Sequence, residues 1–197
     1  IPNMTHPANI DSQIEKKKNH AISVGRLYHQ KGFDLLVSAW SIVEQKHKDW
    51  MLDIYGDNGL LKQDIKKQIR DLELSNEIKL HNPTREIFSK YQESEFYVMS
   101  SRYEGWGLVL VEAMSCGIPC VAFDCPYGPS DIIEHEKNGL LVKNGDIQGL
   151  ADAICWMIEH EEERKQMGLA AKETSKKYVP EVIMKQWDKL FKELVKQ

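Results

Sequence analysis

The sequence of 197 residues contains no long apolar run and no excess of basic residues. Its longest apolar stretches, residues 107–113 and 118–123, fall far below the roughly 20 residues that a membrane-spanning helix needs. The net charge of -4 gives the surface no general basic field. We therefore predict neither a transmembrane segment nor a nucleic-acid partner. An apolar content of 42% is typical of a globular domain with a buried core.

Cysteine is also scarce, and the four that occur fit neither a dense disulfide framework nor paired zinc knuckles. Three of them, Cys116, Cys120 and Cys125, are close in sequence, which leaves a metal or redox site as an alternative. Packing as small buried side chains is favoured, and we expect all four, including Cys155, to be reduced thiols. The seven histidines are scattered and no His, Asp or Glu cluster has metal-ligand spacing, so we predict no metal and no cofactor.

The distribution of polar residues divides the chain into three parts. Residues 1–18 are polar and contain a lysine run, as expected of an exposed linker. Residues 19–178 are predicted to form one folded domain, and residues 179–197 an amphipathic helix with Trp187 at the centre of its apolar stripe. Because the chain starts at Ile1 without an initiator Met, we expect it to be part of a longer protein.

Short apolar runs alternate with helical patterns along the predicted domain. This alternation indicates an α/β fold, namely a doubly wound, Rossmann-like parallel sheet of about six strands with helices on both faces. Ligands are then expected at the carboxyl ends of the strands. The predicted strands are 21–24, 51–55, 77–80, 96–99, 120–123 and 139–142, and the clearest helices are 33–46, 61–72, 146–158 and the C-terminal helix.

A glycine and two cations follow the first predicted strand, in the sequence V-G-R-L from residue 24 and K-G-F-D from residue 31. Gly25 permits a tight turn, while Arg26 offers a bidentate fork and Lys31 a compact charge for phosphate oxygens. A merely solvated Arg and Lys is the alternative. The turn lacks G-x-G-x-x-G, and no acidic residue lies about 20 positions on at the end of a second strand, so a dehydrogenase is not indicated.

Two glutamates flank a second strand-to-helix junction, S-R-Y-E-G-W-G-L from residue 101. Glu104 lies in the loop and Glu112 lies about one turn inside the following helix. Because each carboxylate accepts two hydroxyl hydrogen bonds, the pair suits recognition of sugar hydroxyls better than glycoside hydrolysis. An ordinary position on the helix surface is the alternative for Glu112.

Together the segments resemble the C-terminal, donor-binding domain of the GT-B fold, retaining, nucleotide-sugar-dependent glycosyltransferases of family 4, also called group 1. The similarity covers about residues 20–160, and the chain resembles members that build bacterial surface polysaccharides. The segments that carry it are V-G-R-L with K-G-F-D, I-Y-G-D at 54–57, S-R-Y-E-G-W-G-L-V-L-V-E-A-M-S-C-G-I-P at 101–119 and N-G-L-L-V at 138–142.

The resemblance assigns a role to each candidate residue. It implies that Arg26 and Lys31 hold the donor diphosphate, that Glu104 contacts the donor sugar and that Glu112 binds the ribose. Of these, Arg26, Lys31 and Glu104 are the predicted catalytic residues. Further donor-site positions are implied at turns and at the helix start, namely Gly25, Gly56, Trp106, Gly107 and Leu108.

Two loops depart from the commoner family pattern. The segment 81–84, H-N-P-T, replaces an aromatic-Gly pair and leaves the base open between uridine, guanosine and adenosine. The segment 127–131, Y-G-P-S-D, resembles members that use UDP-hexoses, so a UDP-sugar is the predicted donor. Asp131 is a secondary candidate, with capping of a short helix as the equal alternative.

The resemblance implies transfer of a hexosyl group from the nucleotide diphosphate to an acceptor hydroxyl, without a metal. The acceptor, a glycan or lipid-linked glycan, would be bound through an N-terminal domain outside this chain, and the chain alone would be inactive. A cytoplasmic location is expected, with peripheral association at the inner face of the membrane left open. Two alternatives remain: a domain of a non-hydrolysing nucleotide-sugar epimerase and a catalytically silent sugar-nucleotide-binding module.

Overall fold

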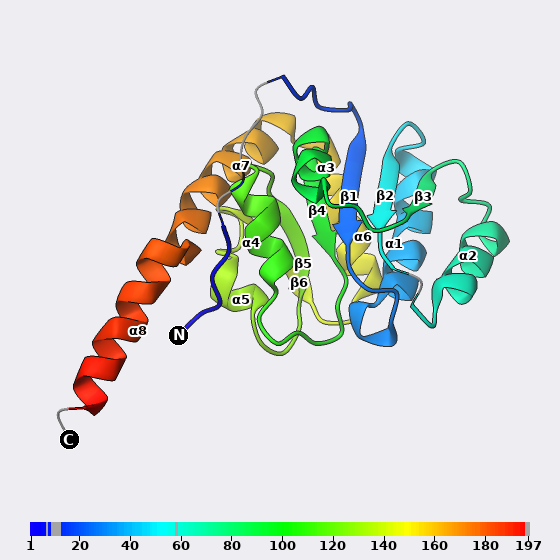
Figure 1. Ribbon diagram of the computed structural model, residues 1–197. Coiled ribbons are helices and arrows are strands. Elements are labelled where there is room, and N and C mark those ends of the chain that lie inside the picture. The colour runs from blue at the N-terminus through cyan, green and yellow to red at the C-terminus, as the bar shows by residue number, and fades with distance from the viewer. Residues whose placement is uncertain (7, 9–12, 58, 196–197) are drawn as a thin grey trace.

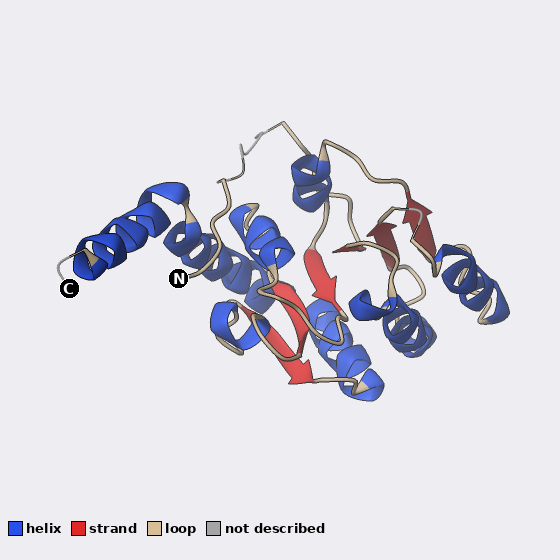
Figure 2. Cartoon of the chain, turned by 60° about the horizontal axis from the view of Figure 1, so that its bottom comes forward, coloured by secondary structure: helices blue, strands red, loops and turns tan. Residues whose placement is uncertain are grey.

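The computed structural model describes residues 1–6, 8, 13–57 and 59–195 and shows three layers, a central sheet between two sets of helices (Figures 1 and 2). Parts of the predicted linker 1–18 and the end of the predicted C-terminal helix lie outside these residues. The strands are β1 (His20–Val24), β2 (Met51–Tyr55), β3 (Ile78–His81), β4 (Phe96–Met99), β5 (Cys120–Asp124) and β6 (Gly139–Lys143). The α-helices are α1 (Phe33–Lys46), α2 (Lys62–Asp71), α3 (Ile87–Glu93), α4 (Leu108–Ser115), α5 (Pro129–Ile132), α6 (Ile147–Glu159), α7 (Glu161–Ser175) and α8 (Pro180–Leu194), and the 3-10 helices are η1 (His29–Lys31) and η2 (Lys176–Tyr178).

All strand pairs in the six-stranded sheet are parallel, in the order β3-β2-β1-β4-β5-β6. This is the doubly wound, Rossmann-like order, so the predicted fold class is confirmed. The bounds of β2 and β4 are as predicted, and those of the other strands differ by one residue at one or both ends. The strands could be located from sequence because they are short apolar runs buried on both faces.

The two faces of the sheet bury separate apolar clusters. Alternate strand residues such as Leu52 and Val98 pack against α1, α2 and α6 on one face. Their neighbours along the strands, such as Tyr97 and Ala122, pack against α3, α4 and α5 on the other. Because α1 and α4 lie on opposite faces, the chain leaves β1 and β4 in opposite directions. The crevice between these two strand ends is the expected ligand site of a doubly wound sheet.

Two helices, α3 and α7, were not predicted. Helix α3 has only seven residues, too few for a periodic apolar pattern. Helix α7 is longer, but its buried face consists mainly of polar and small side chains rather than large apolar ones. Among them, Arg164 is almost wholly buried. The signal that locates amphipathic helices is therefore absent from both segments.

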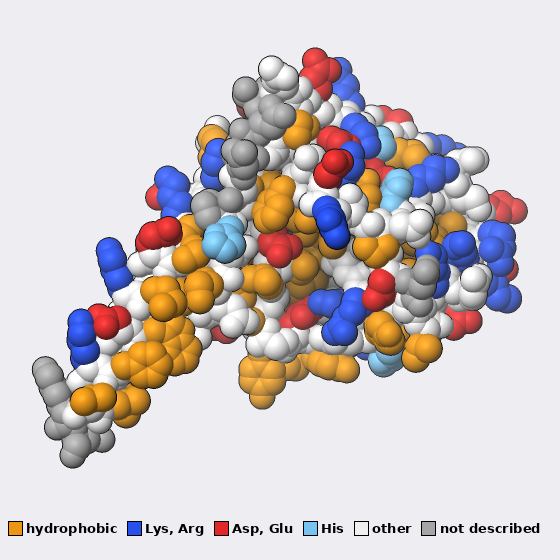
Figure 3. Space-filling model, viewed as in Figure 1, with side chains coloured by type: hydrophobic (Ala, Val, Ile, Leu, Met, Phe, Trp, Pro, Cys, Tyr) orange, Lys and Arg blue, Asp and Glu red, His pale blue; other side chains and the backbone are white. Residues whose placement is uncertain are grey.

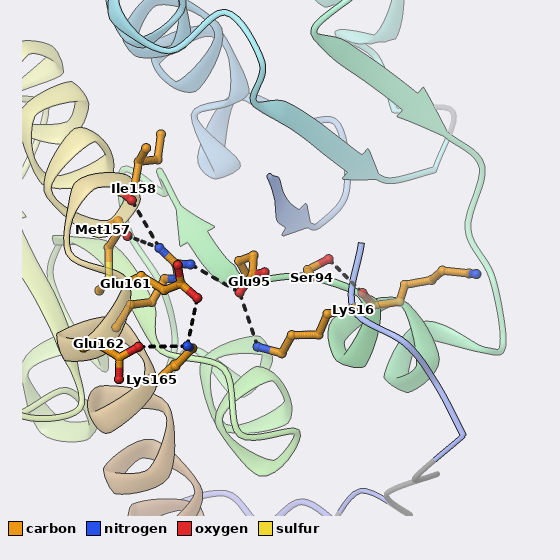
Figure 4. A network of polar contacts seen from close by, with 10 residues as sticks. Lys16, Ser94, Glu95, Met157, Ile158, Glu161, Glu162 and Lys165 are labelled. Carbon is orange, nitrogen blue, oxygen red and sulfur yellow. Dashed lines mark hydrogen bonds and ion pairs between the residues drawn. The ribbon is translucent and has the colours of Figure 1, made fainter. Parts of the chain in front are cut away.

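A polar network around Arg164 joins three distant segments of the chain (Figure 4). The guanidinium donates to the Met157 carbonyl at 2.5 Å, lies 3.5 Å from the Glu95 carboxylate and stands 5.5 Å from the centre of the Trp50 ring. Glu95 also faces Lys16, with Nζ and Oε2 3.6 Å apart. The segment that precedes β1 is thereby attached to the end of the sheet opposite the strand carboxyl ends.

Helix α8 extends away from the body of the domain (Figure 1). Ile183 is fully buried, whereas Met184, Phe191 and Leu194 are each more than half exposed. Hydrophobic side chains gather along one side of this helix (Figure 3), where the Trp187 and Phe191 rings stack at 5.6 Å. Within the described ranges, no helix combines the length and the apolar character that crossing a membrane requires.

Candidate functional site

Two glycines allow the carboxyl ends of β1 and β2 to approach closely. The Gly25 amide donates to the Tyr55 carbonyl at 3.0 Å. A Cβ atom at Gly56 would stand 2.5 Å from the Gly25 carbonyl oxygen, a distance that no ordinary side chain tolerates. A Cβ at Gly25 would in turn press at 3.3 Å on the side chain of Lys31. The aliphatic part of Lys31 therefore lies over the glycine turn.

A cavity of about 360 Å³ opens beside these glycines, at the expected crevice. Its walls include Gly25 and Arg26 after β1, Gly56 after β2, Thr84 after β3 and Glu112 on α4. Four predicted donor-site residues from three separate segments therefore share one cavity. The volume lies at the small end of the range of about 300–1,000 Å³ that is usual for small-molecule sites.

Lys31 and Glu104 form an ion pair next to the cavity. Lys31 Nζ lies 2.6 Å from Glu104 Oε1, and the Ser101 hydroxyl donates to the same oxygen at 2.6 Å. Only 16% of the Lys31 side chain and 7% of the Glu104 side chain are exposed. The structure thus brings together two residues that the sequence analysis had assigned to different parts of the donor.

Glu112 reaches the cavity from the middle of α4. Burial raises the pKa of its carboxyl, and a hydrogen bond from the Tyr91 hydroxyl at 3.4 Å partly offsets this effect. Tyr91 itself is fully buried, with its pKa well above the usual value, and so remains a donor. A half-buried carboxylate with a fixed phenol donor differs from the ordinary helix-surface position that was the alternative.

The start of α4 is set by a glycine in the left-handed conformation. Gly107 has φ 87° and caps the helix, whose first residue, Leu108, is 38% exposed. The preceding Trp106 packs edge-on against Tyr178 at 5.0 Å. A Cβ at Gly128 would lie 1.9 Å from the Trp106 carbonyl, so the loop after β5 also presses on this helix start. The free amides of the first turn remain available to an anion.

Two of the candidates, Arg26 and Asp131, have exposed side chains. The Arg26 guanidinium stands 5.7 Å from the centre of the Tyr28 ring, a cation-π distance. Asp131 lies in the first turn of α5, which is capped by Gly128 without a side-chain hydrogen bond. The first-turn position is as predicted, and a capping role of the Asp131 carboxylate stays a prediction. Asp131 does not line the cavity, and its role in substrate contact stays a prediction.

The sequence analysis missed a cluster centred on Asp53. This buried carboxylate lies 2.6 Å from His81 Nε2 and 3.0 Å from His20 Nδ1, and these two contacts lower its pKa against the opposing effect of burial. The His81 ring stacks at 4.4 Å on Tyr55, which lines the cavity. The three polar residues stand on three different strands, so no spacing within one motif could have indicated the cluster.

The four cysteines all belong to the described part of the chain and are free thiols. Cys120, Cys125 and Cys155 are buried, and burial raises the pKa of each. Within the residues that the structure describes, no group of His, Cys, Asp or Glu side chains has the arrangement of a metal site. Metal independence remains a prediction.

Residues 8–174 match the family described as glycosyl transferases group 1. The chain belongs to this family. The family match extends over β1 to β6 and includes every candidate residue of the donor site. Membership of the group 1 glycosyl transferases does not favour the alternative that the chain is a domain of a nucleotide-sugar epimerase.

Characterised relatives of this group 1 domain are longer than the chain. It is 34% identical over 178 residues to the amylovoran biosynthesis glycosyltransferase AmsD of Erwinia amylovora, spanning 90% of the chain and 49% of that protein. It is 35% identical over 187 residues to the poly(ribitol-phosphate) alpha-N-acetylglucosaminyltransferase of Staphylococcus aureus strain COL, spanning 94% of the chain and 37% of that protein. The chain thus spans about half or less of the length of these two relatives.

Solved structures show the same architecture with a nucleotide bound. A mutant of S. aureus TarM, in complex with fondaparinux, alpha-GlcNAc-glycerol and UDP, matches 95% of the chain with a TM-score of 0.89 and 32% identity, over 38% of that chain. The pneumococcal O-GlcNAc transferase GtfA, in complex with UDP and GlcNAc, matches the whole chain with a TM-score of 0.84 and 26% identity, over 39% of that chain. The chain thus has the fold of the matching part of these longer glycosyltransferases.

Proposed function

We propose that this group 1 domain is the donor-binding half of a family 4, retaining glycosyltransferase that moves a hexosyl group from a UDP-sugar to an acceptor hydroxyl. The observation that carries the proposal is the cavity where β1, β2 and α4 bring together Gly25, Arg26, Gly56 and Glu112. UDP in the TarM and GtfA complexes supports the choice of base.

The diphosphate is assigned to Arg26 and Lys31. In the reaction, the bond between the anomeric carbon and the diphosphate oxygen breaks, and the anomeric carbon bonds to the acceptor oxygen, whose proton is released. Negative charge develops on the departing diphosphate. Arg26 lines the cavity and Lys31 crosses the Gly25 turn, so both cations flank the same strand end. A preorganised charge of this kind supplies about 3–4 kcal/mol of transition-state stabilisation.

The sugar and the ribose are assigned to the two glutamates. Glu112 lines the cavity and carries a fixed tyrosine donor, which suits two adjacent ribose hydroxyls. Glu104 stands beside Lys31, next to the point where a diphosphate would meet its sugar. The amides at the start of α4, near Trp106, Gly107 and Leu108, complete the proposed pocket. The charge of the two cations allows transfer without a metal ion.

The rest of the enzyme is proposed to cover α8 and to bind the acceptor, a glycan or lipid-linked glycan. The chain spans about half or less of the length of the two relatives described above. The exposed apolar stripe with Met184, Phe191 and Leu194 is a surface that such a second half would bury. We accordingly propose that the chain alone binds donor weakly and does not turn over, and that the full protein acts in the cytoplasm or at the inner membrane face.

Nucleotide titration tests this function. UDP, GDP and UDP-glucose are added to the chain up to millimolar concentration, with NMR chemical shifts as the readout. We expect saturable UDP binding that Arg26→Ala and Glu112→Ala each weaken about tenfold or more. Matched controls are Arg70→Ala on α2 and Glu173→Ala on α7, both exposed and outside the cavity. Absence of binding to the wild-type chain, or equal losses in the controls, contradicts the proposal.

A further inference from the structure

The loop before α1 and the loop after β4 are joined by a consecutive set of hydrogen bonds. Three successive carbonyls, those of His29, Gln30 and Lys31, each accept a hydrogen bond from the β4 loop. The donors are Arg102 Nη1 at 2.8 Å, the Arg102 amide at 2.8 Å and the Ser100 hydroxyl at 3.0 Å. One arginine supplies two of the three bonds, from its side chain and its backbone.

The two loops are also in direct backbone contact. Gly32 has φ 62°, and a Cβ at this position would lie 2.0 Å from the Ser100 carbonyl oxygen. A side chain there would have to displace backbone, so the glycine of K-G-F-D is required by this approach. The close contact leaves the β4 loop little room to slide along η1.

Arg102 is held from the other side by Asp34, the last residue of the same motif. The guanidinium makes a bidentate contact with the carboxylate, at 2.8 and 2.5 Å. This contact lowers the pKa of Asp34, so the carboxylate is charged at neutral pH. The Arg102 carbonyl accepts a further bond from the Asn144 side chain at 3.0 Å. Arg102 is therefore fixed at its guanidinium, its amide and its carbonyl.

The contacts of Arg102 connect the segments that carry Lys31 and Glu104, two residues of the proposed donor site. Lys31 ends η1, and Glu104 follows Arg102 by two residues. We propose that the Asp34–Arg102 pair is a positioning element that holds the Lys31 ammonium and the Glu104 carboxylate at their working separation, and so sets affinity for the diphosphate and sugar of the donor. The inference rests on the function proposed above and adds residues to which no role had been assigned.

The Asp34–Arg102 pair is partly exposed, which indicates that it contributes more to the position of the two loops than to the stability of the whole domain. The Asp34 side chain is 38% exposed and that of Arg102 is 23% exposed. Because both groups keep part of their surface in water, we expect the pair to contribute little to the free energy of unfolding. Lysine cannot replace Arg102 in this geometry, because it has no planar fork to meet the carboxylate and the His29 carbonyl together. Substitution therefore loosens the two loops while the core remains folded.

The test compares ligands that do and do not reach the two loops. Uridine, UDP and UDP-glucose are titrated by NMR against the wild-type chain, Arg102→Lys, Asp34→Asn and the double variant. We expect each single variant to weaken UDP and UDP-glucose about tenfold, equivalent to about 1.4 kcal/mol. Uridine binding stays within about twofold, because the lining of the cavity that holds the proposed ribose ligand Glu112 includes neither Asp34 nor Arg102. The double variant matches the single ones, since the two residues act as one unit.

A control variant and a hydrogen-exchange measurement distinguish a positioning role of the Asp34–Arg102 pair from a purely structural one. Lys67→Gln breaks the exposed Lys67–Asp71 pair and leaves all three affinities unchanged. Hydrogen exchange at the Arg102 amide accelerates in Asp34→Asn if the loops loosen. Unchanged UDP affinity in both single variants, or an equal loss for uridine with a lower Tm, overturns the positioning role while the proposed function stands. A wild-type chain that binds no UDP overturns the proposed function as well.

Discussion

The ion pair between Lys31 and Glu104 leads to a quantitative prediction for stability. Its atoms lie 2.6 Å apart, and both side chains are largely buried. At an effective dielectric constant of about 20, two unit charges at this distance attract by about 6 kcal/mol, and the cost of removing them from water offsets most of that. We therefore expect a coupling free energy of about 1–3 kcal/mol from a double-mutant cycle.

The single variants of this cycle differ in what they leave behind. Lys31→Met leaves a carboxylate that is 7% exposed and that, among the described residues, retains the hydrogen bond from the Ser101 hydroxyl. We expect it to lower the free energy of unfolding by about 2–4 kcal/mol. Glu104→Gln leaves an ammonium group that can reach water more easily, so we expect a loss of about 1–2 kcal/mol. The double variant is expected to be no less stable than Lys31→Met alone.

Urea unfolding at pH 7, followed by tryptophan fluorescence, measures these values. The exposed Lys67–Asp71 pair serves as the matched control, with an expected coupling below about 0.5 kcal/mol. Molar salt should weaken the control coupling more than the buried one, because buried pairs are screened less. Additive single effects at Lys31 and Glu104, within about 0.3 kcal/mol, refute the reasoning.

Three further predictions concern the cavity and the thiols. Gly56→Ala drives a Cβ against backbone and should lower stability by about 1–3 kcal/mol, whereas Gly105→Ala, with open space around its Cβ, should leave it nearly unchanged in the same urea assay. Burial raises the Glu112 pKa above 4.5. The domain is therefore expected to lose stability as pH rises through the ordinary carboxyl pKa, and to stay less stable above the raised pKa. Glu112→Gln should flatten this pH profile and raise Tm at pH 7 while weakening UDP binding, and a lower Tm contradicts this. The three buried cysteines, Cys120, Cys125 and Cys155, should react with a disulfide reagent only after unfolding, as a thiol titration at pH 8 can show.

The strands and the first and last long helices were predictable because each has a simple apolar signal. Helix α1 buries Leu36, Val37, Ala39, Trp40 and Val43, and its predicted bounds are the observed ones. Helix α7 presents Arg164 and small side chains instead, so its burial depends on partners elsewhere in the chain. Apolar periodicity cannot report a buried face that is made of polar groups with distant partners.

The motifs located the site residues but did not reveal how they connect. Gly25, Gly56 and Glu112 were predicted from turns and from the resemblance, and they share one cavity. The pairing of Lys31 with Glu104 was not predicted, because the two residues belong to motifs 73 positions apart. The bidentate contact between Asp34 and Arg102 was not predicted for the same reason, because these residues are 68 positions apart. Motif spacing specifies which chemistry is present, whereas long-range contacts specify how it is arranged.

Three glycine contacts explain why these motifs occur where they do. Cβ atoms at Gly32, Gly56 and Gly128 would each lie 2.5 Å or less from a carbonyl oxygen of another loop at the carboxyl edge of the sheet. The loops after β1, β2, β4 and β5 therefore touch through backbone rather than through adaptable side chains. A frame of this kind holds Lys31 and Glu104 in place before any donor arrives, which is the condition for electrostatic preorganisation. Substitution of one of these glycines is then expected to move a whole loop and its charged groups, and to affect more than one part of the donor at once.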